Sequence, residues 1–186
     1  MKAKQWILGA ITAALGIVAG IFGFLNMFDY KTITTVGGNT AEWFAKKPWG
    51  IFGGEVNKTL TTTLDIADKD YSGAFRTIAM ILVIVLLVAV VAYVALLALD
   101  YKKGSKFSGL RKIIAIVMAT LGVLLAVSLL VYVLGNNATI TPTTHKLYCS
   151  SVFGAIALTV FPVLAGVAGY MAECGAKAKK SSKKKK

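Results

Sequence analysis

The sequence has little charge for its length, and it lacks the side chains on which most enzymes depend. Only 16% of its 186 residues are charged, whereas a soluble domain usually carries about a quarter. Its single histidine is His145, and it contains neither a Cys-x-x-Cys pair nor a glycine-rich phosphate loop. The interiors of its long apolar runs hold no carboxylate, lysine or histidine, although proton relays and ion-coupled carriers need such groups. We therefore expect neither an enzyme nor a proton-coupled carrier, and we expect no cofactor and no metal site.

Cysteine is also scarce. Cys149 and Cys174 are the only two, and they flank opposite ends of one apolar run. Because this separation is about the thickness of a membrane, they cannot form a disulfide with each other. We interpret both as interface residues, with lipidation of Cys174 beside the basic tail as the alternative.

Four long apolar runs account for a hydrophobic content of 56%. A helix of about 20 apolar residues crosses the hydrocarbon layer, and it satisfies its own backbone hydrogen bonds there. The runs therefore predict an all-α membrane protein, a four-transmembrane-helix bundle, over residues 1–176. The predicted spans are residues 6–28, 74–99, 113–134 and 147–172. Four charged residues near the span ends are expected to reach the lipid headgroups: Arg76, Asp100, Lys112 and Glu173.

Basic residues are unevenly distributed between the segments that connect the spans. The start of the chain, residues 100–112 and the tail together carry 14 of them. The outer loops, residues 29–73 and 135–146, carry six, which six acidic residues partly balance. The positive-inside rule therefore predicts that both termini are cytoplasmic, and we expect the membrane to be the plasma membrane.

The tail, residues 177–186, is rich in lysine and is expected to be disordered. Its simplest interpretation is a solvated topology signal. The functional interpretation is docking onto anionic lipids at the cytoplasmic face, where each nearby lysine contributes about 1 kcal/mol. We expect no nucleic-acid partner despite the net charge of +13. The lysines that would contact headgroups are Lys177, Lys179, Lys180, Lys183, Lys184, Lys185 and Lys186.

Small residues recur at helical spacing in the first and third spans, which lets another helix approach closely. We predict that they form helix-packing faces within the bundle, with self-association as the alternative. These residues are Gly9, Ala13, Gly16, Gly20 and Gly23 in the first span, and Ala115, Ala119, Gly122 and Ala126 in the third. The fourth span offers further contact positions, Gly154 near its outer end and Ala165, Gly169 and Ala172 near its inner end. The second span lacks such a stripe, so we expect it to face lipid over most of its circumference. In the fourth span Pro162 should introduce a kink.

The first outer loop is long enough to contribute a small β-sheet. Residues 31–36, 57–66 and 137–145 are rich in threonine, and the first two segments also alternate and contain β-branched residues, so we expect a small sheet drawn from both loops. A short helix over residues 59–68 is the alternative. Between the first two segments lies an aromatic stretch that would contact either the membrane interface or another protein. Its candidate contact residues are Trp43, Phe44, Trp49 and Phe52.

This plan resembles the claudin-type tetraspan plan in topology. Trp43 and the segment Pro48-Trp49-Gly50 are similar to the tryptophan motif of the first claudin loop, but the paired cysteines of that motif are missing here. The resemblance implies side-by-side assembly through membrane helices and outer loops.

These observations predict a non-enzymatic integral membrane subunit with a structural or assembly role. It would pack laterally with itself, as a homo-oligomer, or with partner membrane proteins. One alternative is a channel or transport component with an uncharged pore lined by threonine, serine and backbone. Another is an accessory subunit that anchors a larger membrane complex through the basic tail.

Overall fold

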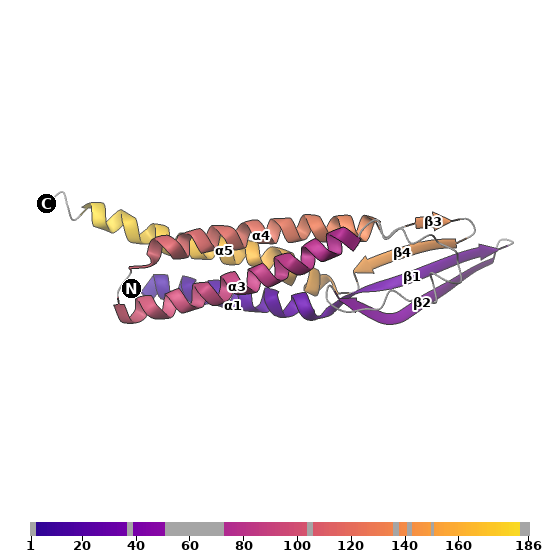
Figure 1. Cartoon of the computed structure of the whole chain (residues 1–186), viewed down its shortest axis with the longest axis horizontal. Coiled ribbons are helices and arrows are strands. Elements are labelled where there is room, and N and C mark those ends of the chain that lie inside the picture. The colour runs from indigo at the N-terminus through magenta and orange to yellow at the C-terminus, as the bar shows by residue number, and fades with distance from the viewer. Residues whose placement is uncertain are drawn as a thin grey trace. The chain divides into compact units, whose positions relative to one another are not determined.

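The apolar runs of the sequence form four long helices in the computed structural model (Figure 1). Its backbone is described for residues 3–36, 39–50, 73–103, 106–135, 138–140, 143–149 and 151–182, and its side chains for 3–25, 74–101, 106–134 and 151–174. The helices are α1 (Ala3–Phe24), α3 (Gly73–Lys103), α4 (Ser108–Gly135) and α5 (Val152–Ser182). All four are long and apolar enough to cross a membrane. The prediction of an all-α, four-span, multi-pass membrane protein is thereby confirmed.

The helix boundaries differ from the predicted spans by several residues. α1 ends at Phe24 rather than at residue 28, and α5 begins at Val152 rather than at residue 147, because strands occupy the residues in between. α4 begins at Ser108, before the predicted start at residue 113. α5 continues to Ser182, so a helix covers residues 177–182, where disorder was expected. Alanine and lysine are good helix formers, which accounts for this extension.

The chain forms two compact units. One consists of Met1–Phe22, Leu82–Ala126 and Ile156–Lys186, and it contains most of the four helices. The other consists of Gly23–Ile81 and Val127–Ala155, and it contains the strands together with the adjoining helix ends. We call them the helical unit and the strand unit.

The buried positions of α3 follow a heptad rhythm. They are spaced alternately by four and three residues, as in the seam of a left-handed coiled coil: Ala79, Val83, Leu86, Val90, Tyr93, Leu97 and Asp100. Only 28% of the apolar stretch of α3 is buried, which is the lowest share among the four helices. The expectation that this helix mostly faces lipid agrees with that share, although the helix also has a continuous inner stripe of mostly large side chains.

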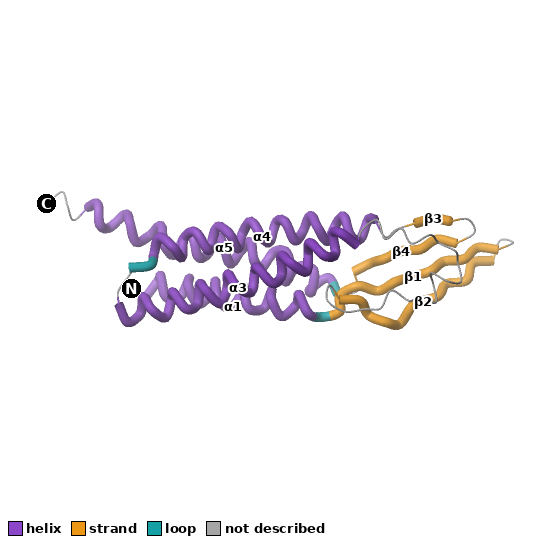
Figure 2. The backbone as a smooth tube through the Cα atoms, viewed as in Figure 1, coloured by secondary structure: helices purple, strands orange, loops and turns teal. Residues whose placement is uncertain are grey.

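The strand unit contains a four-stranded antiparallel sheet with the order β2-β1-β4-β3 (Figure 2). Its strands are β1 (Asn26–Val36), β2 (Asn39–Gly50), β3 (Ala138–Ile140) and β4 (Thr143–Cys149). The pairing of β1 with β4 joins the first outer loop to the second, residues 135–146, as the sequence predicted. Both loops must therefore lie on the same side of the membrane, as four crossings require.

The aromatic stretch of the first loop was expected between two strands, but it lies within a strand. Trp43, Phe44 and Trp49 belong to β2, which is an edge strand of the sheet. The register shifts between the pairs Phe28↔Trp49 and Tyr30↔Ala45. Pro48 falls inside this irregularity, where an edge strand tolerates the missing backbone donor. Phe52 and the predicted strand or short helix at residues 57–68 lie outside the described residues.

Candidate functional site: a buried charge cluster in the helical unit

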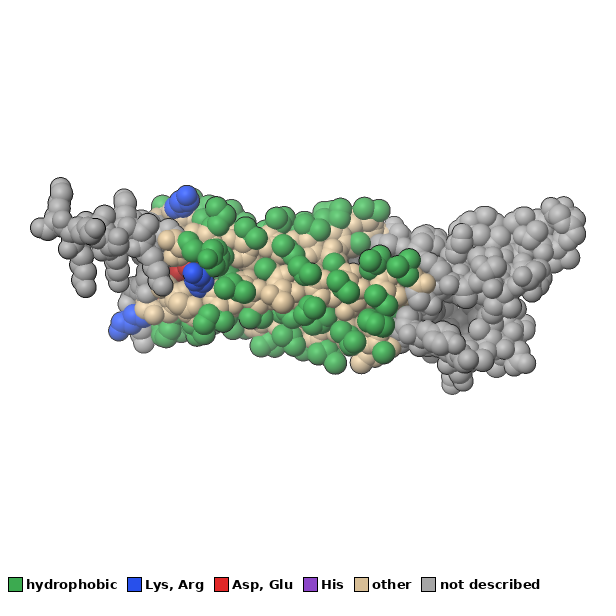
Figure 3. All heavy atoms as spheres, turned by 90° about the horizontal axis from the view of Figure 1, so that it is seen from above, with side chains coloured by type: hydrophobic (Ala, Val, Ile, Leu, Met, Phe, Trp, Pro, Cys, Tyr) green, Lys and Arg blue, Asp and Glu red, His purple; other side chains and the backbone are tan. Residues whose placement is uncertain are grey.

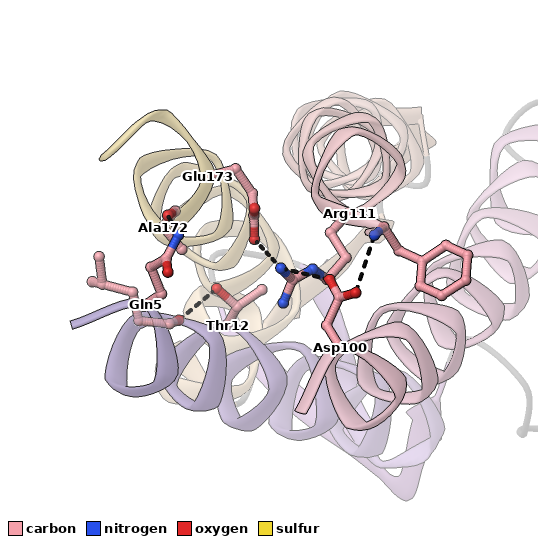
Figure 4. A network of polar contacts seen from close by, with 8 residues as sticks. Gln5, Thr12, Asp100, Arg111, Ala172 and Glu173 are labelled. Atoms are coloured by element: carbon pink, nitrogen blue, oxygen red, sulfur yellow. Dashed lines mark hydrogen bonds and ion pairs between the residues drawn. The ribbon is translucent and has the colours of Figure 1, made fainter. Parts of the chain in front are cut away.

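Each of the four helices turns one polar or charged side chain into the helical unit at the same end of the helices (Figure 4). α1 contributes Gln5, α3 contributes Asp100, α4 contributes Arg111 and α5 contributes Glu173. Their exposed fractions are 7%, 0%, 0% and 4%, respectively. These four side chains form a buried polar layer, within which Asp100, Arg111 and Glu173 make up what we call the charge cluster.

Arg111 is the centre of the charge cluster. Its Nη2 atom lies 2.9 Å from Asp100 Oδ2 and 3.1 Å from Glu173 Oε1. These contacts are close ion pairs rather than aligned hydrogen bonds. Removing an ion from water costs several kcal/mol, and attraction between opposite charges offsets that cost only at such short distances. One guanidinium therefore joins α3, α4 and α5.

Asp100 has a second role at the connection between α3 and α4. Its Oδ1 atom accepts a hydrogen bond of 3.0 Å from the backbone N–H of Phe107. The carbonyl of Phe107 in turn accepts a 3.0 Å bond from the backbone N–H of Arg111. The Asp100 carboxylate thus binds the backbone just before α4 and pairs with the Arg111 side chain of α4. Asp100 therefore stabilises the connection between α3 and α4.

α1 is connected to α5 through the side-chain amide of Gln5. Gln5 Nε2 donates to the carbonyl oxygen of Ala172, which directly precedes Glu173, at 3.3 Å. Thr12 is fully buried, and its hydroxyl donates to the Leu8 carbonyl of the same helix at 2.8 Å. Both groups satisfy polar atoms inside an apolar bundle, as buried donors and acceptors require.

The structure corrects the sequence analysis at these positions. Asp100 and Glu173 were expected to reach the headgroups, and the spans were expected to hold no internal charge. Instead both carboxylates are buried against Arg111, within helices that are long enough to span. The signal was their spacing: Asp100 continues the heptad series of α3, Arg111 precedes the buried Ala115 by four residues, and Glu173 follows the buried Gly169 by four.

Aromatic and basic side chains surround this end of the helical unit. The rings of Trp6 and Tyr101 meet edge to face with centroids 5.2 Å apart. Lys112 Nζ lies 4.5 Å from the centre of the Tyr170 ring. Tryptophan, tyrosine and lysine in this arrangement are typical of the membrane–water interface. Half-buried Lys112 is therefore placed as an interfacial residue, unlike its neighbour Arg111.

The predicted small-residue face of α1 is directed at α3. A Cβ atom added to Gly9 would fall 2.9 Å from Leu97 Cδ1, and one added to Gly16 would fall 2.5 Å from Val90 Cγ2. A Cβ on Gly20 would collide with Leu87. Gly23 is buried as well, whereas Ala13 is half-buried.

The small residues of α4 are directed at α5. A Cβ on Gly122 would fall 2.9 Å from the carbonyl oxygen of Thr159. Gly166, on α5, was missed by the sequence analysis, and a Cβ there would meet the backbone of Ala115 and Ala119. Ala115 is buried and Ala119 half-buried, but Ala126 is exposed. Ala126 is the one residue among the nine predicted packing positions that faces outward.

The remaining predicted contact residues fall outside the described side chains. Trp43, Phe44 and Trp49 have a described backbone in β2, and Lys177, Lys179 and Lys180 have one in α5. Phe52 and residues 183–186 are not among the described residues.

No protein-family model matches the chain, and no curated protein matches it.

Proposed function

We propose that this integral membrane protein is a non-enzymatic structural or assembly subunit, which associates laterally with its own copies or with partner membrane proteins. The observation that carries the proposal is the division between the interior and the surface of the helical unit. The charge cluster and the glycines Gly9, Gly16, Gly20, Gly122 and Gly166 make close contacts within the chain. On the visible face of the helices, apolar side chains cover the surface and basic ones gather at one end (Figure 3).

The exposed part of α4 is the surface that we propose for lateral contact. Val123, Leu124 and Leu130 are 54%, 46% and 60% exposed, and the exposed Ala126 lies among them. A small residue between larger apolar ones lets a second helix approach, and van der Waals packing of this kind drives helix association in lipid.

A channel or transport component is less well supported. Gly166 brings α5 so close to α4 that a Cβ would meet the backbone of Ala115. Such contact leaves no space for a solute between these two helices. A pore would therefore have to pass between other helices of the chain or between copies of the chain. Anchoring of a larger complex through the basic tail is compatible with the same surface.

The orientation is part of the proposal. The 14 basic residues of the start, of residues 100–112 and of the tail favour cytoplasmic termini, at the plasma membrane. The polar layer would then lie near the cytoplasmic face. There the lysines of the tail would meet anionic lipids, and the outer-loop residues Trp43, Phe44, Trp49 and Phe52 would be available to neighbours on the other side.

The deciding experiment is the mass of the particle extracted with its lipids, compared between matched variants. Wild type should be larger than one chain, and Ala126→Leu should shift the distribution toward single chains without changing helix content. Ala14→Leu is the matched control, because Ala14 is also exposed but lies on α1. A wild-type particle that is strictly monomeric and has no partner would exclude the assembly function. Ion flux from purified protein in liposomes would favour the pore.

A further inference from the structure

The charge cluster contains one more negative group than positive groups. Asp100 and Glu173 are both carboxylic acids, and Arg111 is the guanidinium that pairs with them. Arginine stays protonated in proteins, so two ionised carboxylates would leave the charge cluster with a net charge of −1. The side chains of Arg111 and Asp100 are 0% exposed and that of Glu173 is 2% exposed, so water cannot compensate this charge.

The excess negative charge can be assigned to one atom, Glu173 Oε2. Asp100 uses both oxygens, one toward Phe107 and the other toward Arg111. Glu173 uses Oε1 toward Arg111, while its buried Oε2 has no hydrogen-bond partner among the described residues. An uncompensated carboxylate in such surroundings is strongly unfavourable, and the usual outcome is that it takes up a proton.

A metal ion fits this position less well than a proton. Hard cations need several oxygen ligands, whereas among the described residues the buried side-chain oxygens without a hydrogen-bond or ion-pair partner are Glu173 Oε2 and the Tyr93 hydroxyl. In the described part of the chain, no group of three or more His, Cys, Asp or Glu side chains could hold a metal ion. A proton needs only the one oxygen.

We propose that the charge cluster is a proton-binding site, in which Glu173 carries a proton on Oε2 at neutral pH while Asp100 and Arg111 remain an ionised pair. Glu173 Oε1 still accepts the contact from Arg111. Release of the proton at higher pH places a second negative charge beside Asp100 and weakens the attachment of α5 to the pair formed by α3 and α4. The site thereby makes the helix packing responsive to pH.

The groups that face Glu173 come from all the neighbouring helices. α3 supplies Asp100 and the buried Tyr93, and α4 supplies Arg111. α1 supplies the uncharged Gln5, which binds the carbonyl that precedes Glu173. On α5 itself Lys177 follows by four residues, and its side chain lies outside the described residues. The test must therefore separate a proton on Glu173 from compensation by Lys177.

The protonation state can be read directly from the glutamate carboxyl groups. The chain contains three glutamates, Glu42, Glu55 and Glu173, so ¹³C labelling of glutamate gives three carboxyl signals in the full-length protein in lipid nanodiscs. At neutral pH one signal should belong to a protonated acid, and it should disappear in Glu173→Gln. Asp100→Asn should also remove it, because Glu173 then becomes the only carboxylate paired with Arg111. An asparagine oxygen can still accept the bond from Phe107.

Stability supplies the second readout. Between the pH at which Glu173 ionises in the unfolded chain and the higher pH at which it ionises in the folded protein, the wild-type unfolding constant in mixed micelles should rise by up to about tenfold per pH unit, because the folded state then holds one proton more than the unfolded state. At still higher pH the dependence should level off. Glu173→Gln should remove this dependence and remain folded at high pH.

Three results would overturn the proposal. The first is a wild-type spectrum at neutral pH in which all three glutamates are ionised. Compensation by Lys177 would produce this result, and Lys177→Gln would then change the spectrum. The second is stability that follows sodium or potassium concentration instead of pH, which would indicate an alkali ion. The third is a pH dependence that persists unchanged in Glu173→Gln. If that variant fails to fold, the wild-type and Asp100→Asn spectra still decide.

Discussion

Arg111 joins three helices through a single guanidinium group. Both of its carboxyl partners are buried, so its removal does more than delete two contacts: it leaves the Asp100 carboxylate without a counter-charge inside the helical unit. The loss of one member of a buried ion pair costs about 3–5 kcal/mol, far more than the net contribution of an intact pair. The effect of replacing a residue of this cluster on stability therefore depends on which buried charge loses its partner.

Replacement of Arg111 by glutamine should strongly destabilise the protein, by about 3–5 kcal/mol of unfolding free energy. Reversible unfolding in mixed detergent micelles measures this change. The adjacent Lys112 is the matched control, because it is a half-buried basic residue on the same helix that lies over the Tyr170 ring. Lys112→Gln should cost less than about 1 kcal/mol. Equal effects of the two substitutions would show that Arg111 behaves as an interfacial residue.

The sequence predicted the helices well and the charge cluster poorly, for a physical reason. Hydropathy reports whether a segment can cross the membrane, and the run from Ala74 onward could be nothing else. The interpretation from hydropathy assumes that a charge near a span end turns toward water. For Asp100 and Glu173 the direction depends on whether an opposite charge on another helix meets them, and that is a tertiary property. The spacing of Asp100 from the apolar residues of α3 was visible in the sequence, but its partner on α4 was not.

At the scale of elements, the helices are held together by contacts that differ in kind. α1 meets α3 through glycines that receive the ends of large side chains, as Gly9 receives Leu97. α4 and α5 meet backbone to backbone at Gly166. A flexible side chain can shift to admit an extra methyl group, whereas a backbone cannot. The interface between α4 and α5 should therefore be the less tolerant of the two.

Gly166→Ala tests this difference with the smallest possible change. Its Cβ would meet the carbonyl oxygen of Ala115 and fall 2.7 Å from the nitrogen of Ala119, so overpacking should cost about 1–3 kcal/mol of unfolding free energy. Gly109→Ala is the matched control, because a Cβ at this glycine of α4 has nothing within 4 Å. That variant should stabilise the protein by up to about 1 kcal/mol. Both values come from the same micelle unfolding assay. A neutral Gly166→Ala would mean that the two helices can separate without loss.

At the scale of the whole molecule, the pairing of β1 with β4 connects parts of the chain that lie more than a hundred residues apart. Phe28 and Cys149 are opposite each other in this register. Directly opposed residues of antiparallel strands have Cα atoms about 4.5–5.5 Å apart, which lies within the range of a disulfide. The same pair of positions can therefore report both the register of the sheet and the side of the membrane on which it lies.

In a Cys174→Ser background, Phe28→Cys should form a disulfide with Cys149 when the purified protein is mildly oxidised, detected by a shift in non-reducing electrophoresis and by mass. Lys31→Cys is the control, because Lys31 pairs with Lys146 and its cysteine would lie three positions away along the strand. If the termini are cytoplasmic, the sheet lies outside, where disulfides persist, and the bond should also form in cells without added oxidant. A bond that forms in the purified protein but stays reduced in cells would support the register and reverse the orientation. Equal cross-linking of the two variants would contradict the register itself.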